Sequence, residues 1–573
     1  MEKFKLYYKE HKELFYLGFL VLGCILFIFA NIGIYPLIDI DETRYVNMSK
    51  YMFLEKQYLT PILNFEPFLE KPPLYFWLNV LVFKILGYKS VFAGRFATGM
   101  VATFGIFYTY FFAKKISNNR LYGFLSANVL LCSAWFLVFS HIAILDLGFM
   151  VFSMSAIYSA ILALFVEKEQ NKKFCWYFGY LFMALSILAK GFIGIAIPCM
   201  VVFFTYLLFK KVNELFKPIN LLGVFILLIV ALPWHIMIWE VHKDAWVNMY
   251  ILKHHFARLL TSEDLGRKQP FLFYVPIFLM GLIPWLFNFL AKIYEDTKKL
   301  INKIKNTKNS AWKNFFYPDT KDKKVMYFAY TYALCAFLFF SSASTKLPPY
   351  ILTMFPALAL IVGDFWYRAI KFNETEKSLK ISNYINFILL LTVSILGLLF
   401  SMIYKTILPE SAKYYVENAF SFALPALIFI VIISIFAIIL IKKRKVFKVF
   451  FIHIILMLGV IFVVCGFGLP YYTSFAQDEL EDFANYVYSI ENSSLVTYGF
   501  SAKYSILNPH KKIKYIVGEE PQDYKNLENY ITETPKTKHF IMTRIKINDF
   551  ENKKEYKKIK EGKVYRLYTK TLE

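Results

Sequence analysis

The sequence has little that would support redox, metal or nucleotide chemistry. Its six cysteines all lie in apolar stretches, and none has a CxxC neighbour or a spaced partner that would complete a metal site. It contains no GxGxxG motif or P-loop in a strand-helix setting. Charged residues make up only 18% of the 573 residues, and we find neither an internal repeat nor a low-complexity linker. Disulfides, structural zinc and nucleotides are therefore not expected. No cofactor is expected to be required; a divalent metal ion is the open alternative, which the sequence does not indicate.

Apolar surface, by contrast, is abundant. Hydrophobic residues make up 58% of the chain and aromatic residues 20%, far above the soluble average. The net charge of +24 would indicate nucleic acid in a soluble protein, but most Lys and Arg lie in short runs between apolar stretches. That pattern is typical of cytoplasmic loops that follow the positive-inside rule. Membrane lipids are expected partners, and nucleic acid is not.

Apolar stretches of roughly 20 residues, long enough to cross a bilayer, predict a polytopic α-helical membrane protein with about 13 transmembrane helices. They lie near 13–34, 90–113, 121–139, 142–166, 174–189, 191–211, 219–239, 270–292, 325–343, 348–369, 381–404, 416–441 and 446–470. The first follows a basic start, as a signal peptide would, but it is longer than a signal-peptide core. We interpret it as a retained anchor.

Basic connections alternate with neutral ones, which predicts the orientation. Lysine and arginine gather near 114–120, 168–173, 210–217, 292–324, 368–380 and 442–445. All these connections fall on the same side as the N-terminus, which is therefore expected in the cytoplasm. An odd number of spans then leaves the C-terminus outside. We expect a multi-pass protein of the bacterial inner (plasma) membrane with a periplasmic C-terminal part.

The C-terminal part differs in character from the rest of the chain. Residues 471–573 are polar and cysteine-free, with a helical pattern from Phe483 to Ile490. Short strand-like runs follow at 495–500, 513–517, 539–543 and 564–569. We predict a transmembrane domain over residues 1–470 and a small extracytoplasmic α/β domain over 471–573.

The first outer loop combines acids with fixed cations. It reads Asp39-Ile40-Asp41-Glu42-Thr43-Arg44-Tyr45 and, later, Phe68-Leu69-Glu70-Lys71-Pro72-Pro73-Leu74-Tyr75. Acids beside an arginine at a helix exit suit a site that handles both a proton and an anion. Pro72-Pro73 stiffens the backbone, so Lys71 is presented in a defined direction. The alternative is a solvent-exposed juxtamembrane loop whose charges have no function.

Three ionisable residues, Asp146, Lys190 and Lys346, lie at the edges of predicted spans. Such residues are costly in a membrane and are functional candidates by default. The predicted topology puts all three at the outer face, on the same side as the first outer loop. A single one would more often be a snorkelling edge charge, but three separate loops on one side favour a site.

A second long outer loop carries Lys253-His254-His255-Phe256-Ala257-Arg258 and, further on, Arg267. Adjacent histidines point apart on a helix, and no Cys or spaced His completes a ligand set, so no metal site is predicted. His255 and Arg258 would instead share a helix face. Arginine and lysine clustered at a membrane surface are suited to hold a phosphate, and a lipid-linked phosphate fits best.

Six short motifs carry a resemblance to a known family. They are Asp41-Glu42-Thr43-Arg44-Tyr45, Glu70-Lys71-Pro72-Pro73, Leu188-Ala189-Lys190-Gly191, His255-x-x-Arg258, Pro270-Phe271 and Lys346-Leu347-Pro348-x-Tyr350-Ile351-Leu352. In their order, spacing and sidedness, residues 1–470 resemble the bacterial lipid A aminoarabinose transferases and the related protein O-mannosyltransferases. That family has the GT-C fold. The C-terminal part resembles it only in position and size.

The resemblance implies an inverting glycosyltransferase that takes a monosaccharide from a polyprenyl (undecaprenyl) phosphate donor at the periplasmic face. It also implies roles for particular residues. The catalytic candidates are Asp41, Glu42 and Asp146; the donor-phosphate candidates are Arg44, Lys71, Lys190, Arg258 and Lys346; the substrate-pocket candidates are Tyr45, Glu70, His255, Arg267 and Tyr350. Where the aminoarabinose transferases often carry Glu-His before the shared arginine, this chain has His254-His255. The sugar therefore cannot be carried over.

The expected acceptor is lipid A or another cell-envelope molecule, and the chain is expected to act as a monomer. Transfer to protein, as in the mannosyltransferases, is the alternative within the family. A lipid-linked sugar transporter or flippase would place polar groups near the bilayer midplane and often show inverted repeats, whereas the charges here lie at helix ends. The quoted motifs argue against an oligosaccharide polymerase or ligase.

Overall fold

The structure, a computed structural model, describes residues 11–257, 269–306, 320–407, 410–500, 503–508, 510–518, 520–534, 537–551 and 553–570. The chain forms two compact units. The first comprises Met1–Ile32, Leu69–Tyr75 and Phe96–Gly466, and the second comprises Gly33–Phe68, Phe76–Arg95 and Phe467–Glu573. The second unit thus joins two early segments of the chain to its C-terminal part. The predicted domain division at residue 470 stays a prediction.

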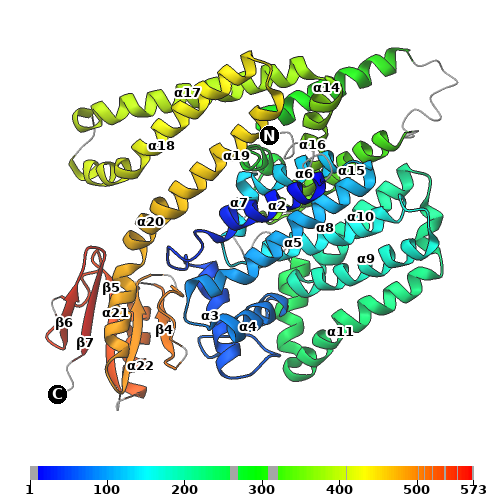
Figure 1. Cartoon of the computed structure of the whole chain (residues 1–573). Helices are drawn as coiled ribbons and strands as arrows, with labels where there is room; N and C mark the ends of the chain where they lie inside the picture. Colours follow the sequence, from blue (N-terminus) through cyan, green and yellow to red (C-terminus); the bar gives the residue numbers. More distant parts are fainter. Residues whose placement is uncertain are drawn as a thin grey trace. The chain divides into compact units, whose positions relative to one another are not determined.

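The first unit is helical (Figure 1). Its elements, with most of α5 included, are α2 (Lys12–Cys24), η1 (Ile25–Phe29), α5 (Val91–Ser117), α6 (Arg120–Leu131), α7 (Ala134–Ser140), α8 (Leu145–Leu162), α9 (Glu169–Lys190), α10 (Ile193–Leu208), η2 (Val212–Phe216), α11 (Ile219–Trp246), η3 (Val247–Ala257), η5 (Phe271–Phe273), α13 (Tyr274–Gly281), α14 (Leu286–Asn306), α15 (Lys321–Ser342), η7 (Pro348–Met354), α16 (Phe355–Phe372), α17 (Glu376–Ile407), α18 (Glu410–Lys442), α19 (Val446–Val463) and η8 (Val464–Gly468).

Each of the apolar stretches predicted to span the membrane is helical. Among the described residues, nine helices are long and apolar enough to cross a bilayer, and eleven spans result if two bent pairs are each counted as one. The bent pairs are α6 with α7, at 66°, and the helix over Phe271–Gly281 with α14, at 116°. α10 is apolar but shorter, and α9 has 22 residues. The prediction of a polytopic helical membrane protein is confirmed, and the count of thirteen stays a prediction.

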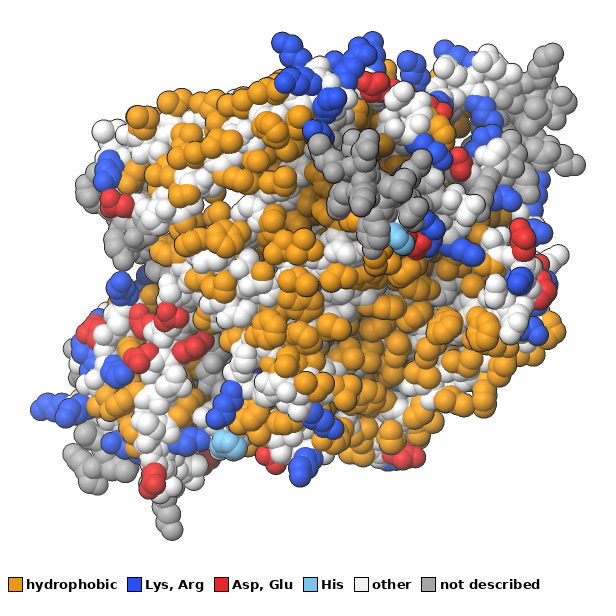
Figure 2. Space-filling view, viewed as in Figure 1, with side chains coloured by type: hydrophobic (Ala, Val, Ile, Leu, Met, Phe, Trp, Pro, Cys, Tyr) orange, Lys and Arg blue, Asp and Glu red, His pale blue; other side chains and the backbone are white. Residues whose placement is uncertain are grey.

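The surface of these helices explains why the chain needs a membrane. Leu221 in α11 is 74% exposed and Met402 in α17 is 79% exposed. Figure 2 shows hydrophobic side chains spread over the visible face of the helical unit. Apolar patches of this extent are stable only against lipid or another protein.

Two glycines shape the turn between α9 and α10. Gly191 ends α9 with a φ of 85°, a conformation that residues with a side chain rarely adopt. A Cβ atom at Gly194 would lie 2.5 Å from the backbone nitrogen of Ile187, so α10 begins against the last turn of α9. The Leu188-Ala189-Lys190-Gly191 motif therefore places Lys190 at the end of a tight helical hairpin.

The second unit contains an α/β part and helices from the first loop. Its elements are α3 (Asp41–Leu54), β1 (Ile62–Leu63), β2 (Glu66–Pro67), most of α4 (Leu74–Leu86), α20 (Leu469–Ala476), α21 (Asp478–Tyr488), β3 (Ser493–Tyr498), β4 (Ile513–Ile516), α22 (Pro521–Glu533), β5 (Lys538–Arg544), β6 (Tyr556–Glu561) and β7 (Tyr565–Lys570). The five-stranded sheet has the order β4-β3-β5-β7-β6. β3 pairs in parallel with β4 and β5, while β7 is antiparallel to β5 and β6.

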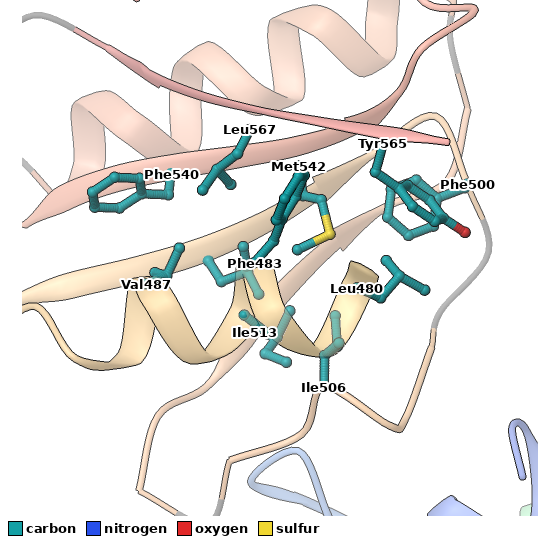
Figure 3. Packing of buried hydrophobic residues seen from close by; sticks show 12 residues of the cluster. Leu480, Phe483, Val487, Phe500, Ile506, Ile513, Phe540, Met542, Tyr565 and Leu567 are labelled. Carbon is teal, nitrogen blue, oxygen red and sulfur yellow. The ribbon is translucent and has the colours of Figure 1, made fainter. Parts of the chain in front are cut away.

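Strand alternation separates the sheet's two faces. On one face Phe540 and Met542 pack with Phe483 and Val487 of α21 (Figure 3). On the other, Val496 and Ile541 pack with Leu527 and Ile531 of α22. The predicted helix and all four predicted strands are confirmed. α22 and β6 were not predicted, because their outer positions are polar and leave a weak periodic signal.

Candidate active site

Asp41 begins α3 and is the exposed member of the acidic pair in the second unit. Its side chain is 65% exposed and pairs with the Arg44 guanidinium at 2.5 Å. Arg44 also donates to the Tyr45 hydroxyl at 3.1 Å, and its guanidinium carbon lies 4.9 Å from the Tyr45 ring centroid. A carboxylate in the first turn of a helix is favoured by the helix dipole. Asp41 is therefore oriented by a cation and accessible to a substrate.

Glu42 has a different environment. It accepts two hydrogen bonds from Arg95, one from Nε at 2.6 Å and one from Nη2 at 2.7 Å, and the two side chains are 1% and 0% exposed. Arg95 also donates to the carbonyls of Tyr35 at 2.8 Å and Pro36 at 2.7 Å. The geometry favours Asp41 over Glu42 as the acid that meets a substrate, because Glu42 is enclosed by this ion pair. Arg95 lies inside the predicted span 90–113 and was missed, although an ionisable residue in such a span is a signal.

The backbone just before Asp41 is held by two residues from the C-terminal part of the same unit. The Gln477 side chain donates to the Leu37 carbonyl at 2.8 Å and accepts from the Asp39 amide at 3.0 Å. The Asp39 carboxylate accepts from the Ser505 amide at 2.8 Å and its hydroxyl at 2.7 Å. These bonds fix the approach of the chain to α3. No local sequence signal marks Gln477 or Ser505, because their partners are more than 400 residues away along the chain.

In the first unit, Asp146, Lys190 and Tyr350 meet from three elements. Asp146 lies in the first turn of α8, Lys190 ends α9, and Tyr350 lies in η7. The Lys190 ammonium forms an ion pair with Asp146 and lies 4.2 Å from the Tyr350 ring centroid. The structure thus brings these three residues together, while their location at the outer face and their roles stay predictions. An ammonium held between a carboxylate and a ring face has a defined direction.

Lys346 supplies a second buried cation in that unit. Its ammonium donates to the carbonyls of Ala343 at 2.7 Å and Gln269 at 3.0 Å, and the residue is 6% exposed. Removal from water lowers the pKa of Lys346, because the charged form loses hydration. A bound phosphate would favour the charged form, because it would replace the lost hydration.

This lowered pKa gives a test of Lys346. We expect kcat/KM for the donor to fall on the alkaline side at a pH below that of an exposed lysine, since the free enzyme loses the ammonium there. In Lys346→Arg the guanidinium stays charged, so this alkaline fall should move to higher pH. Steady-state rates between about pH 6 and 10.5 would show it, the upper bound being the usual lysine value. An identical profile in both proteins would remove Lys346 from the donor site.

Of the remaining predicted site residues, the structure describes the side chains of some and not of others. Glu70 lies in the first unit, where its carboxylate is 3.4 Å from Nε2 of His254, and Lys71 beside it is half-buried. His255 belongs to η3, but its side chain lies outside the described part of the structure, as do Arg258 and Arg267. Across the described residues, no group of three or more His, Cys, Asp or Glu side chains is close enough to hold a metal ion. The expectation that no metal is required stays a prediction.

An apolar cavity of about 440 Å³ lies beside the end of α9. Its walls come from α9, α10, α11 and η3, and include Ile187, Phe192, Ala231 and Trp246. Ile187 and Phe192 flank Lys190 in the sequence, so part of the cavity wall lies within one helical turn of Lys190 along the chain, although Lys190 itself does not line the cavity. A cavity with this lining accepts a hydrocarbon chain.

A second charge cluster on α16 is separate from this site. Lys292 of α14 pairs with Asp364 at 2.7 Å, and Arg368 pairs with the same carboxylate at 3.0 Å. Asp364 lies further along the chain than Tyr350, and at a helical rise of about 1.5 to 2 Å per residue the two are roughly 20 Å apart along the helix axis. The cluster therefore ties α14 to α16 away from Lys190. Asp364 was not among the predicted residues, although it is an ionisable residue inside the predicted span 348–369.

Together the helical membrane unit and the mixed sheet define a protein of the GT-C fold class. The crystal structure of ArnT from Cupriavidus metallidurans bound to undecaprenyl phosphate aligns with 96% of this chain and 97% of that chain, at a TM-score of 0.77 and 17% identity. In its apo state the same protein aligns with a TM-score of 0.71. The GT-C fold implied by the motifs is confirmed.

The family that this chain resembles is likewise the one predicted. Residues 70–239 match the family described as dolichyl-phosphate-mannose-protein mannosyltransferase. The undecaprenyl phosphate-alpha-4-amino-4-deoxy-L-arabinose arabinosyl transferase 2 of Proteus mirabilis is 26% identical over 60% of this chain, and the match spans 58% of that relative's length. An uncharacterized protein of Aquifex aeolicus is 26% identical over 66% of this chain and 67% of its own.

Proposed function

We propose that this protein is an inverting GT-C glycosyltransferase that moves a monosaccharide from a polyprenyl phosphate to a cell-envelope acceptor at the periplasmic face. The single observation that carries the proposal is the meeting of Lys190, Asp146 and Tyr350 at the C-terminal end of α9, a helix whose last turn also lines an apolar cavity. A directed cation on a helix that borders a hydrocarbon-lined space matches a substrate that joins a phosphate to a long apolar chain. A water-soluble nucleotide sugar would have no use for that cavity.

The cations stabilise the leaving group, which is the lipid phosphate. As the glycosidic bond breaks, its electron pair passes to the lipid phosphate, and negative charge builds on the phosphate oxygens. Cations placed in advance stabilise this state more than the ground state. Lys190 and Lys346 are suited to that work because both ammoniums are withdrawn from water. Loss of one such charge typically reduces the rate by 10²- to 10³-fold.

Asp41 acts on the acceptor, by deprotonating or orienting it. An acceptor hydroxyl attacks the anomeric carbon from the side opposite the phosphate, and its proton passes to the Asp41 carboxylate. The Arg44 guanidinium holds that carboxylate in place. A phosphate acceptor is already deprotonated, and for it the carboxylate would orient rather than remove a proton.

The names of the matched relatives support a particular donor and two kinds of acceptor. Proteins named as undecaprenyl phosphate-aminoarabinose transferases are among the matches, which supports an undecaprenyl phosphate donor and lipid A as first acceptor. The match of residues 70–239 to protein mannosyltransferases supports a protein acceptor as the alternative. We further propose a monomer of the bacterial inner membrane with a cytoplasmic N-terminus and a periplasmic C-terminal part.

The test is mass spectrometry of lipid A and of surface glycoproteins from cells with and without the gene. We expect a monosaccharide to be lost from one acceptor class in the deletion strain and regained with the wild-type gene. The mass difference then names the sugar and the acceptor together. Glycans that are identical in all strains would instead favour a lipid-linked sugar transporter.

A further inference from the structure

A polar cavity of about 250 Å³ lies in the second unit, apart from the residues discussed so far. Its walls come from α3, the β1–β2 hairpin, the turn after α4 and the segment before β4. The lining includes Lys50, Lys89, Tyr51, Phe65, Tyr88 and Asn508. The cavity thus combines two cations with three aromatic rings and an amide.

Lys50 is the unusual member of this set. It is half-buried, and within the described part of the chain no hydrogen bond or ion pair engages its ammonium. Burial lowers the pKa of Lys50, and the charge of Glu481 opposes this only in part. Burial also raises the pKa of Glu481 itself, which weakens it as a counter-charge. An ammonium withdrawn from water without a close partner indicates a site for an anion.

The walls of the cavity are fixed by hydrogen bonds that leave the lysines unused. The Asn64 side chain donates to the Ile513 carbonyl at 2.8 Å and accepts from the Ile513 amide at 2.9 Å. Asn47 donates to the Tyr504 carbonyl at 2.9 Å. The hairpin and α3 are thereby attached to the C-terminal part of the unit. Lys89 is exposed at the rim and adds a second positive charge.

The helical geometry separates this cavity from Asp41. Lys50 follows Asp41 by nine residues on α3, which is about two and a half turns at 3.6 residues per turn. The two side chains therefore leave the helix on opposite faces, roughly 13 Å apart along its axis. A ligand in the cavity does not occupy the position of the reacting group.

We propose that this cavity is an accessory binding site for a phosphorylated saccharide, held by Lys50 and Lys89 through its phosphate and by Tyr51, Phe65 and Tyr88 along the apolar face of its ring. Resting on the proposed function, its role is to hold the phosphorylated headgroup of a glycolipid acceptor. The headgroup is thereby captured in this cavity, while the sugar is transferred at the separate position near Asp41.

The first experiment measures binding without catalysis. Purified full-length protein in detergent is titrated calorimetrically with glucosamine 1-phosphate, with glucosamine and with inorganic phosphate. We expect the phosphorylated sugar to bind more tightly than either part. The double variant Lys50→Gln/Lys89→Gln should weaken it roughly tenfold or more, the loss of about one charged hydrogen bond. Asp41→Asn should bind as the wild type does.

Lys56→Gln is the matched control, because Lys56 is an exposed lysine just after α3 that does not line the cavity. Equal binding by the double variant and Lys56→Gln, with both proteins folded by thermal melting, would overturn the site. Inorganic phosphate that binds as tightly as the phosphorylated sugar would overturn the saccharide part and leave a simple anion site.

The second experiment tests the role in transfer. We expect KM for a phosphorylated glycolipid acceptor to rise in the double variant while KM for the donor does not change. An unchanged acceptor KM would overturn the role even if the probe binds. Failure of the proposed function has a different signature: the wild-type protein transfers no sugar while the cavity still binds glucosamine 1-phosphate.

Discussion

Asp41→Asn is expected to abolish sugar transfer while the protein still inserts and folds. The asparagine keeps the shape of the side chain and its exposed position at the start of α3, but it cannot accept a proton. Loss of a general base typically costs 10²- to 10⁴-fold in rate. The measurement is transfer by purified protein from a polyprenyl-phosphate sugar, with binding of the donor followed separately.

Glu55→Gln provides the matched control, because Glu55 is an exposed acid at the other end of the same helix. It should leave the rate unchanged. Wild-type turnover by Asp41→Asn would remove Asp41 from catalysis. A modest loss with lipid A phosphate as acceptor, and a complete loss with a hydroxyl acceptor, would show that the carboxylate orients one and deprotonates the other.

Arg95→Met is expected to produce the largest loss of stability. It leaves the Glu42 carboxylate buried without its two hydrogen bonds from Arg95. Breaking a buried ion pair by removal of one partner costs about 3–5 kcal/mol. Hydrogen exchange of α3 and thermal unfolding of the purified protein would measure this, and we expect both to show a destabilised second unit.

Two control variants distinguish the cost of leaving a charge buried and unpaired from the cost of losing an arginine as such. The double variant Glu42→Leu/Arg95→Met removes both charges and should recover much of the loss, because no ion remains buried alone. Arg120→Met removes an arginine that is 53% exposed and pairs with Glu13 at 3.0 Å. An exposed pair is worth about 0 to 1 kcal/mol. Equal destabilisation by Arg95→Met and Arg120→Met would contradict the structural role of Arg95.

These two substitutions distinguish adjacent acids that the sequence presents as equivalent. Asp41→Asn should change the rate and leave stability unchanged, whereas Arg95→Met should act through stability. Gln477 holds the backbone at Leu37 and Asp39, and Ser505 holds the Asp39 carboxylate, just before Asp41. The C-terminal part of the chain thus contributes to the position of the candidate base as well as to its own fold.

Hydrophobic run length and charge pattern were sufficient to predict the helical membrane class, because each span is a local property of roughly 20 residues. Strand alternation in the C-terminal part was likewise local, and it predicted β3, β4, β5 and β7. The edge charges Asp146 and Lys190 were identified for the same reason: an ionisable residue beside an apolar run is visible without any knowledge of its partner.

The spans and the ionisable residues beside them could therefore be identified from the chain alone. Their partners became known only from the folded arrangement: Glu42 with Arg95, Asp39 with Ser505, and Lys190 with both Asp146 and Tyr350. It also decided that Lys50 lines a cavity. The reason is physical: burial and pairing depend on residues that are distant in the chain, and these determine whether a charge is structural or available to a substrate.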